Sequence, residues 1–249
     1  MTLFGPDKII ECPNCMKLAR VSTLISANTF RARFWTDGRM IAPGLPERPA
    51  ITKCSGCEQY FWISDAKEAS ENFFFRWDRK REKERFDEWC GIEVPYAGRP
   101  EDDEDYHQEW KDAKMVRKLN EAEYLEAISL HVFSGRKQEL ALRRMAWWTC
   151  NDRFRLLRES PVYKPTSIPL QYPEEKANLE RLLELLVINP AALDNDGEIL
   201  MKAEIMRELG LFDDAVALLN RFFPAGENYM ADFMRFIAEH HDCVVREIG

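Results

Sequence analysis

The sequence lacks the features that mark several large protein classes. It contains no run of about eighteen apolar residues, which is the length that a transmembrane helix needs. The opening residues MTLFGPDKII do not combine a basic start with an apolar core, as a signal peptide does. We therefore expect a protein of the reducing cytoplasm with no membrane association.

Residues that commonly support catalysis or phosphate binding are also scarce. The 249 residues include four histidines and eleven glycines. The patterns G-x-G-x-x-G and G-K-S/T, which cradle phosphates, do not occur. His240 and His241 are adjacent, and neighbouring residues of a helix point about 100° apart rather than toward one ion. We expect a surface helix end there and no enzymatic activity.

The charge balance limits the choice of partner. Asp and Glu outnumber Lys and Arg by 43 to 35, which gives a net charge of −8 and a pI of about 5.3. A nucleic-acid-binding protein usually presents a basic face to the phosphates. The balance therefore disfavours nucleic acid as a partner and permits a basic protein.

Paired cysteines are the strongest pattern that the sequence does contain. Cys12 and Cys15 form one C-x-x-C pair, and Cys54 and Cys57 form another. Disulfides are disfavoured in the cytoplasm, so such pairs indicate metal ligands or redox centres. Two turns that each present two thiolates complete the tetrahedral shell of a structural zinc site. Because four protein ligands leave no open position on the metal, we expect one Zn²⁺ ion with a structural role.

This spacing resembles the zinc-ribbon family over residues 10–63. The resemblance implies two cysteine-bearing turns on a small sheet, with a hairpin between them. The chain departs from the family pattern at Met16 and Glu58, which follow the two pairs where many such turns have glycine. A small sheet of this kind buries little apolar surface, so the metal would supply much of its folding free energy.

Three other interpretations of the cysteines remain open. The same four ligands hold iron in rubredoxin-like sites. A C-x-x-C pair is also the redox motif of thioredoxin-like proteins, where it begins a helix after a strand. The four cysteines can also be unliganded core residues. The remaining three, Cys90, Cys150 and Cys243, are isolated and are expected to be buried as small apolar side chains.

A β-hairpin is predicted between the two pairs, with its turn at Asp37-Gly38, because glycine accepts a positive φ without steric penalty. The aromatic and basic residues that alternate here suggest a surface that binds single-stranded nucleic acid. Its rings would stack on the bases, and its cations would neutralise the phosphates. The alternative is that the aromatic residues form a small core and the arginines face water. The candidate partner-binding residues are Arg31, Arg33, Phe34, Trp35 and Arg39.

We expect an α+β protein with three parts. Residues 1–64 are predicted to form the zinc ribbon, residues 65–105 a connecting helix and an acidic linker, and residues 106–249 a mostly helical domain. Asp65 followed by Glu68 is typical of a helix start. Asn120 and Glu123 have the spacing of a capping box that begins a later helix.

The segment from residue 196 to residue 224 is weakly similar to a tetratricopeptide repeat. Ala203 and Ala215 occupy the two places where small residues let paired helices approach closely, and Gly210 ends the first helix. Phe222 departs from the pattern, which has a small residue there. No second copy is evident, so the resemblance implies an antiparallel helical hairpin rather than a solenoid.

These observations favour a non-enzymatic, zinc-containing adaptor whose helical domain binds a protein partner. Two alternatives belong to other classes. One is a nucleic-acid-associated module that uses the aromatic and basic face of the ribbon. The other is an acidic immunity or inhibitor protein that neutralises a basic enzyme.

Overall fold

The computed structural model describes residues 2–5, 7–73, 110, 112–156, 172–187 and 196–248. The chain divides into two compact units. The first contains Met1–Asn28 and Gly44–Leu119, and the second contains Thr29–Pro43 and Asn120–Gly249. The predicted hairpin between the cysteine pairs therefore belongs to the helical unit, although the sequence analysis places it within the ribbon.

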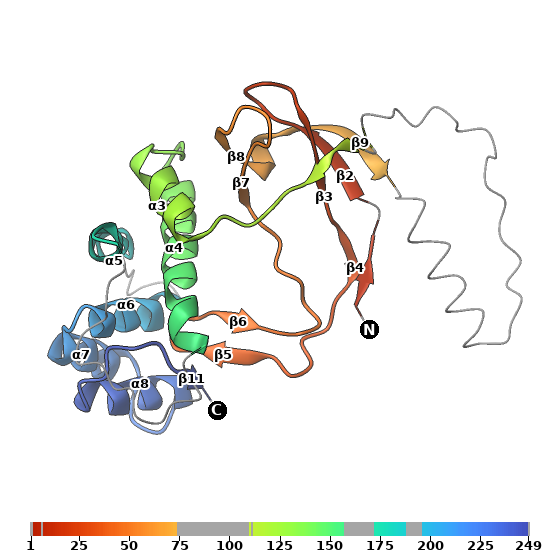
Figure 1. Cartoon of the computed structure of the whole chain (residues 1–249). Helices are drawn as coiled ribbons and strands as arrows, with labels where there is room; N and C mark the ends of the chain where they lie inside the picture. Colours follow the sequence, from red (N-terminus) through yellow and green to blue (C-terminus); the bar gives the residue numbers. More distant parts are fainter. Residues whose placement is uncertain are drawn as a thin grey trace, which may run out of the picture. The chain divides into compact units, whose positions relative to one another are not determined.

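The first unit is built from short strands (Figure 1). Its four-stranded sheet has the order β10-β3-β2-β9, in which β10 runs parallel to β3 and the other pairs are antiparallel. Two separate antiparallel pairs, β1 with β4 and β7 with β8, complete the unit. The strands are β1 (Leu3–Phe4), β2 (Asp7–Glu11), β3 (Leu18–Val21), β4 (Leu24–Ser26), β7 (Ile51–Lys53), β8 (Tyr60–Trp62), β9 (Lys67–Phe73) and β10 (Lys114–Met115). A short 3-10 turn, Ile63–Asp65, follows β8.

Adjacent residues of β2 are buried on opposite faces of this sheet. Ile9 packs with Ala113, while Ile10 packs with the cysteines and Phe61. Because successive side chains of a strand point to opposite faces, apolar groups cover the sheet on both sides at this strand. The side of Ile10 is the one that carries the cysteines.

The expectation of a helix beginning near Asp65 is wrong. Lys67–Phe73 is the strand β9, which pairs with β2 from Asp7↔Phe73 to Glu11↔Lys67. Backbone pairing to a neighbouring strand outweighs a local capping signal here, because propensity is a weak guide where tertiary partners exist. The rest of the expected helix, Cys90 and the acidic run at residues 101–105 lie outside the described residues.

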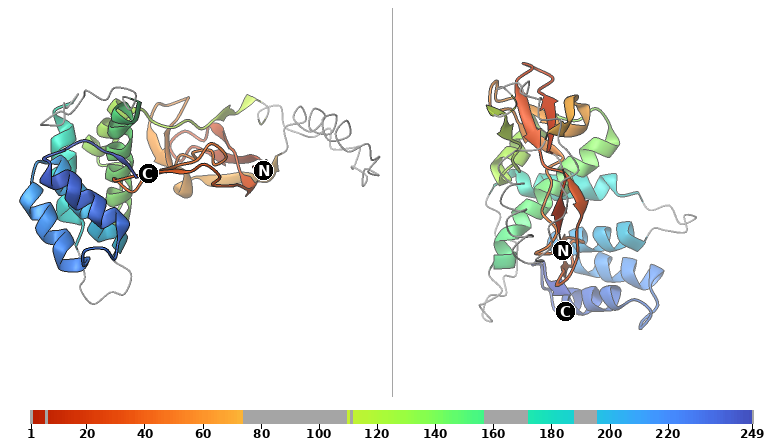
Figure 2. Two further views of the ribbon diagram at one scale, coloured as in Figure 1. Left: turned by 90° about the horizontal axis from the view of Figure 1, so that it is seen from below. Right: turned by 90° about the vertical axis from the view of Figure 1, so that its right-hand side faces the viewer.

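The second unit joins a three-stranded antiparallel sheet to a set of helices (Figure 2). The sheet has the order β11-β5-β6, with strands β5 (Arg33–Trp35), β6 (Met40–Ile41) and β11 (Glu247–Ile248). Its helices in the described residues are α3 (Glu121–Ser129), α4 (Arg136–Leu156), α5 (Glu174–Leu185), α6 (Asp196–Glu208), α7 (Phe212–Phe222) and α8 (Tyr229–Glu239).

Local signals in the sequence explain where several of these elements begin and end. The capping box at the start of α3 is confirmed, because Asn120 Oδ1 accepts from the Glu123 N–H at 2.9 Å and Glu123 Oε2 accepts from the Asn120 N–H at 3.0 Å. Gly38 at the hairpin turn and Gly210 after α6 have φ of 77° and 78°, a region that glycine enters without steric cost.

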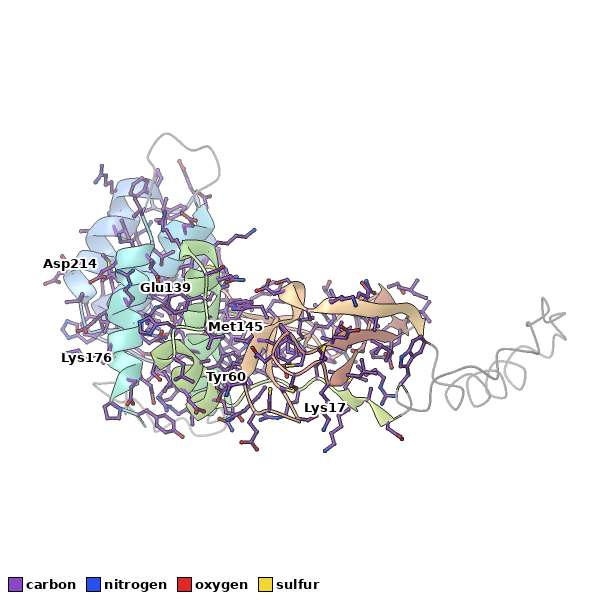
Figure 3. The ribbon with its side chains drawn as sticks, turned by 90° about the horizontal axis from the view of Figure 1, so that it is seen from above. Lys17, Tyr60, Glu139, Met145, Lys176 and Asp214 are labelled. Carbon is purple, nitrogen blue, oxygen red and sulfur yellow. The ribbon has the colours of Figure 1, made fainter. Side chains whose placement is uncertain are left out.

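Two of the apolar clusters in the described residues join helices α4 to α8. The first joins α4, α5 and α6 around Trp147, Leu182 and Ile205. The second joins α6, α7 and α8 and includes Ala203 and Leu219. Between α4 and α5, Glu139, which is labelled in Figure 3, accepts from Arg181 Nε at 3.0 Å. Within the described ranges, no helix has the length and apolar character needed to cross a membrane.

Candidate metal centre

The first cysteine pair lies in the tight turn that joins β2 to β3. The Cys12 N–H donates to the Lys17 carbonyl at 3.0 Å, and the Met16 N–H donates to the Cys12 carbonyl at 2.9 Å. Met16 has a φ of 60°, which reverses the chain so that it can enter β3. The side chain of Lys17 is exposed beside this turn (Figure 3).

The second pair lies in an equivalent turn between β7 and β8. The Cys54 N–H donates to the Gln59 carbonyl at 2.9 Å, and the Glu58 N–H donates to the Cys54 carbonyl at 3.1 Å. Glu58 has a φ of 58°. The Gly56 N–H also donates to Cys54 Sγ at 3.3 Å. The two turns therefore share one backbone geometry, although their sequences differ at every position except the cysteines.

The two turns bring all four sulfurs together. The Sγ atoms of Cys12, Cys15, Cys54 and Cys57 all lie within 4.8 Å of one another. Cys12 Sγ is 3.8 Å from Cys57 Sγ, and Cys15 Sγ is 3.6 Å from Cys54 Sγ. A zinc–sulfur bond of about 2.3 Å in a tetrahedron places the sulfurs about 3.8 Å apart. These two separations therefore fit a tetrahedral ion.

One side of this cluster is buried and the other faces solvent. Cys12 and Cys54 are buried and pack against Ile10 and Phe61. Cys57 is partly buried and Cys15 is exposed. An apolar inner wall excludes water from two of the sulfurs, whereas an ion can reach the cluster from the side of Cys15.

The pKa values of the thiols bear on whether the cluster must hold a cation. Burial raises the pKa of Cys12 to about 12. Burial acts in the same direction on Cys54, but the N–H groups of Cys57 and Gly56 donate to its sulfur and lower its pKa to about 7. Four thiolates at these distances repel one another, so a cation is required to hold all four deprotonated.

The donor set indicates the kind of metal. An all-thiolate tetrahedron suits zinc and also suits iron in sulfur sites. Because the four cysteines fill the shell, no position is left for a substrate or a catalytic water. The four cysteines expected as ligands from the sequence are thus brought together, and the closed shell that they form suits a structural ion.

No family model, curated protein or solved structure matches this chain. The interpretation of the site therefore rests on its geometry and on the chemistry of its donors.

The predicted partner-binding residues of the hairpin are dispersed by the fold. Trp35 and Arg39 are buried inside the second unit, with 3% and 7% of their surface exposed, which makes them unsuitable as contact residues. Phe34 is 48% exposed, and Arg33 Nη2 forms an ion pair with Glu247 at 2.5 Å. Arg31 is exposed, with a φ of 59°. Partner binding by Arg31, Arg33 and Phe34 stays a prediction.

Arg39 and its neighbours belong instead to a buried polar cluster in the second unit, which the sequence analysis missed. Asp37 is fully buried at the hairpin turn. Its Oδ2 accepts from Arg155 Nη2 and from Asn151 Nδ2, the latter at 3.1 Å. Its Oδ1 accepts from the Arg39 N–H at 3.1 Å, and its carbonyl accepts from Trp148 Nε1 at 3.0 Å.

A second ion pair of this cluster lies within α6. Arg207 donates to Glu204 through Nε at 2.8 Å and through Nη2 at 2.6 Å. The hydroxyl of Thr36 donates to Glu204, and Arg207 Nη2 donates to the Val244 carbonyl at 2.9 Å. Both charged side chains are fully buried. The pair therefore connects α6 to the hairpin and to the C-terminal segment.

Glu208 also belongs to this cluster, and the side chains that donate hydrogen bonds to it are uncharged. Its Oε2 accepts from Trp147 Nε1 at 2.7 Å, and its Oε1 accepts from Asn151 Nδ2 at 2.9 Å. Burial, reinforced by the neighbouring charge of Glu204, raises the pKa of Glu208 well above its ordinary value. The folded protein therefore binds this proton more tightly than the unfolded chain does.

A cavity of about 10 Å³ adjoins this carboxyl group, which is room for about one water molecule and not for an organic substrate. Its lining residues are Trp147, Cys150, Asn151, Arg153, Glu175, Asn178, Leu179 and Glu208. Burial raises the pKa of the Cys150 thiol, so this cysteine is a poor nucleophile. The chemistry of the cluster suits structural anchoring of the hairpin.

Proposed function

We propose that this chain is a zinc-stabilised interaction protein. In this proposal Cys12, Cys15, Cys54 and Cys57 hold one structural Zn²⁺ ion in a ribbon-like first unit. The helical second unit binds a protein partner, and the protein acts as an adaptor in the reducing cytoplasm, where a thiolate site persists.

The observation that carries the metal assignment is the agreement between two independent turns. Each turn closes with the same hydrogen bonds and a positive φ, and together they set sulfur separations of 3.6 and 3.8 Å. Such a shell binds an ion tightly and leaves it no vacant position, which supports scaffolding rather than catalysis.

Two features support partner binding by the second unit. The second unit exposes several large apolar side chains, including Leu211 just before α7 and Tyr229 and Phe236 of α8, and exposed apolar groups that gather on one surface mark interaction sites. Ala203 and Ala215 are buried where α6 and α7 meet, as in the helix pair of a tetratricopeptide-type repeat. We extend that likeness to this helix pair only.

Metal analysis of the purified protein tests the first part. We expect one zinc per chain, with no visible absorption in its spectrum. An intense visible absorption band together with one iron per chain would support the rubredoxin-like alternative instead of zinc. A chain purified without metal and folded in its first unit would refute the metal assignment altogether.

The second part is tested by affinity capture of the zinc-loaded chain after reversible crosslinking. We expect one protein to be recovered in stoichiometric amount and to bind the isolated full chain directly. Direct binding that survives disruption of the four cysteines would locate the interaction in the helical unit. Stoichiometric recovery of nucleic acid in place of protein would contradict the proposal.

A further inference from the structure

Helix α8 has a buried side formed by small and apolar residues. Ala231, Met234 and Ala238 are at most 1% exposed, and the first two belong to the apolar cluster with α6 and α7. Arg235 also points inward, since it is 8% exposed and its Nη2 donates to the Phe223 carbonyl at 2.5 Å. Packing against the other helices therefore fixes which side of α8 faces outward.

The outward side of α8 carries a row of aromatic rings. At about 100° per residue, Tyr229, Phe233, Phe236 and His240 fall within an arc of about 60°. Tyr229 is 64% exposed and Phe236 is 56% exposed, and Phe233 is partly exposed. The His240 ring lies 4.2 Å from the Phe236 ring. A helix that ends a helical stack normally presents polar residues outward, so these rings are unusual for a solvated surface.

The charges beside this aromatic row are mainly negative. Glu239 is exposed at one edge of the row, and Asp232, at the same edge, is partly buried and pairs with Arg235 of the same helix. No exposed Lys or Arg lies on α8, whose residues are all described. Helix α7 begins with the exposed acids Asp213 and Asp214, the second of which projects outward in Figure 3. Its opposite end carries one exposed cation, Arg221.

We propose that this aromatic face of α8 binds a cationic, amphipathic helix of a partner protein. The inference rests on the proposed function and specifies the surface and the chemistry of the partner. Apolar side chains of the partner would cover Tyr229 and Phe236. Its Lys or Arg residues would face Glu239 and would lie over the aromatic rings as cations.

The same charges argue against the other occupants of such a face. A second copy would present the same helix, which has no exposed cation to pair with Glu239, so a two-fold dimer would gain no charge complementarity at this face. The phosphates of a nucleic acid or of an anionic membrane would be repelled by Glu239. Of these classes of partner, a cationic protein segment is the one that the charges on this face favour.

Binding of two model peptides to the full, zinc-loaded chain tests this inference. The first is a labelled amphipathic helix of about sixteen residues made of Leu and Lys, and the second has Glu in place of each Lys. Fluorescence anisotropy at several salt concentrations measures both affinities. We expect the Lys peptide to bind at least about tenfold more tightly than the Glu peptide, with an affinity that falls as salt rises.

Variants of the exposed residues locate the binding site. Tyr229→Ser and Phe236→Ser are each expected to weaken binding of the Lys peptide about tenfold or more, because aromatic anchors dominate such interfaces. Phe236→Leu should restore most of the affinity. The matched control is Phe30→Ser, which removes an aromatic side chain that is 73% exposed elsewhere in the same unit. Glu239→Lys should weaken binding and reduce its salt dependence.

Three results would overturn the inference. Equal binding of the Lys and Glu peptides would remove the charge argument. Binding of the Lys peptide that is insensitive to Phe236→Ser would place the contact elsewhere, and the proposed protein-binding function would then survive without this surface. A dimer that Phe236→Ser dissociates in sedimentation experiments would show that a second copy covers the face.

Discussion

Asp37, in the turn of the β5–β6 hairpin, forms a buried ion pair with Arg155 near the end of α4. The two residues are 118 positions apart in the chain. Asp37 is fully buried and Arg155 is 7% exposed. This pair, with the hydrogen bonds around it, accounts for the inclusion of residues 29–43 in the helical unit. The hairpin is inserted between the two metal-binding turns in sequence but packs with helices that follow far later.

Replacement of Asp37 by Asn should destabilise the second unit strongly. It would leave the buried Arg155 with Asp152 as its remaining acidic partner, and a buried pair that loses one partner costs about 3–5 kcal/mol. Chemical unfolding followed by tryptophan fluorescence measures the loss. Asp152→Asn is the matched control, because the side chain of Asp152 is 35% exposed and pairs with both Arg155 and Arg39. We expect a cost of about 1 kcal/mol there. Equal costs for the two variants would contradict the importance of burial.

Glu208 should make stability depend on pH. Because its pKa is raised in the folded state, its contribution is fully present below the unfolded pKa of about 4.3 and is lost as pH rises through the folded value. Glu208→Gln removes this titration. We expect the unfolding free energy of the wild type, relative to the variant, to fall with pH in that window by up to about 1.4 kcal/mol per pH unit. A difference that is constant or rises with pH would show that Glu208 is ionised in the folded protein.

Loss of one ligand should empty the metal site and unfold the first unit. Cys54→Ser is expected to reduce zinc well below one ion per chain, because the shell then has three thiolates and a weak oxygen donor. Structural zinc contributes about 10–16 kcal/mol of apparent binding energy in small domains. The thermal transition of the first unit should disappear while the helical signal of the second unit persists. Cys150→Ala, outside the cluster, should keep the full zinc content. A folded, zinc-replete Cys54→Ser protein would refute the assignment.

Glycine should improve both metal-binding turns. Met16 and Glu58 have φ of 60° and 58°, a region that costs an ordinary residue about 1 kcal/mol or more. Met16→Gly and Glu58→Gly are each expected to stabilise the zinc-loaded first unit by about 0.5–1 kcal/mol, with a higher melting temperature in calorimetry. Asn14→Gly, at a position without positive φ, should destabilise the same turn. Destabilisation by all three substitutions would mean that the side chains of Met16 and Glu58 make compensating contacts.

Local patterns in the sequence were sufficient where the chemistry is local. The C-x-x-C spacing identified Cys12, Cys15, Cys54 and Cys57, since each pair needs only one tight turn to aim two thiolates at a point. Asn120 with Glu123 identified the start of α3 for the same reason. The departure from glycine at Met16 and Glu58 also marked a real backbone feature, because both residues adopt the left-handed conformation.

Features that depend on contacts between segments far apart in the chain could not be predicted from local sequence patterns. Asp65 and Glu68 signalled a helix, but pairing with β2 converts the segment into β9. Trp35 and Arg39 were predicted to lie on the surface. Alternation of residue types along a strand does not show which face of the hairpin packs against the helices of its own unit. The aromatic row on α8 was missed because apolar residues surround that helix, and only its packing reveals which side remains exposed.

The sequence by itself determined the metal-binding cysteines, the two classes of secondary structure and several helix boundaries. These follow from residue spacing and from backbone preferences that act over a few positions. Only the tertiary structure decided that the hairpin belongs with the helices, that Asp37, Glu204 and Glu208 are buried, and that Tyr229 and Phe236 face outward. Burial and ion pairing arise from contacts between segments more than 100 residues apart in the case of Asp37 and Arg155, and no local pattern encodes which segments will meet.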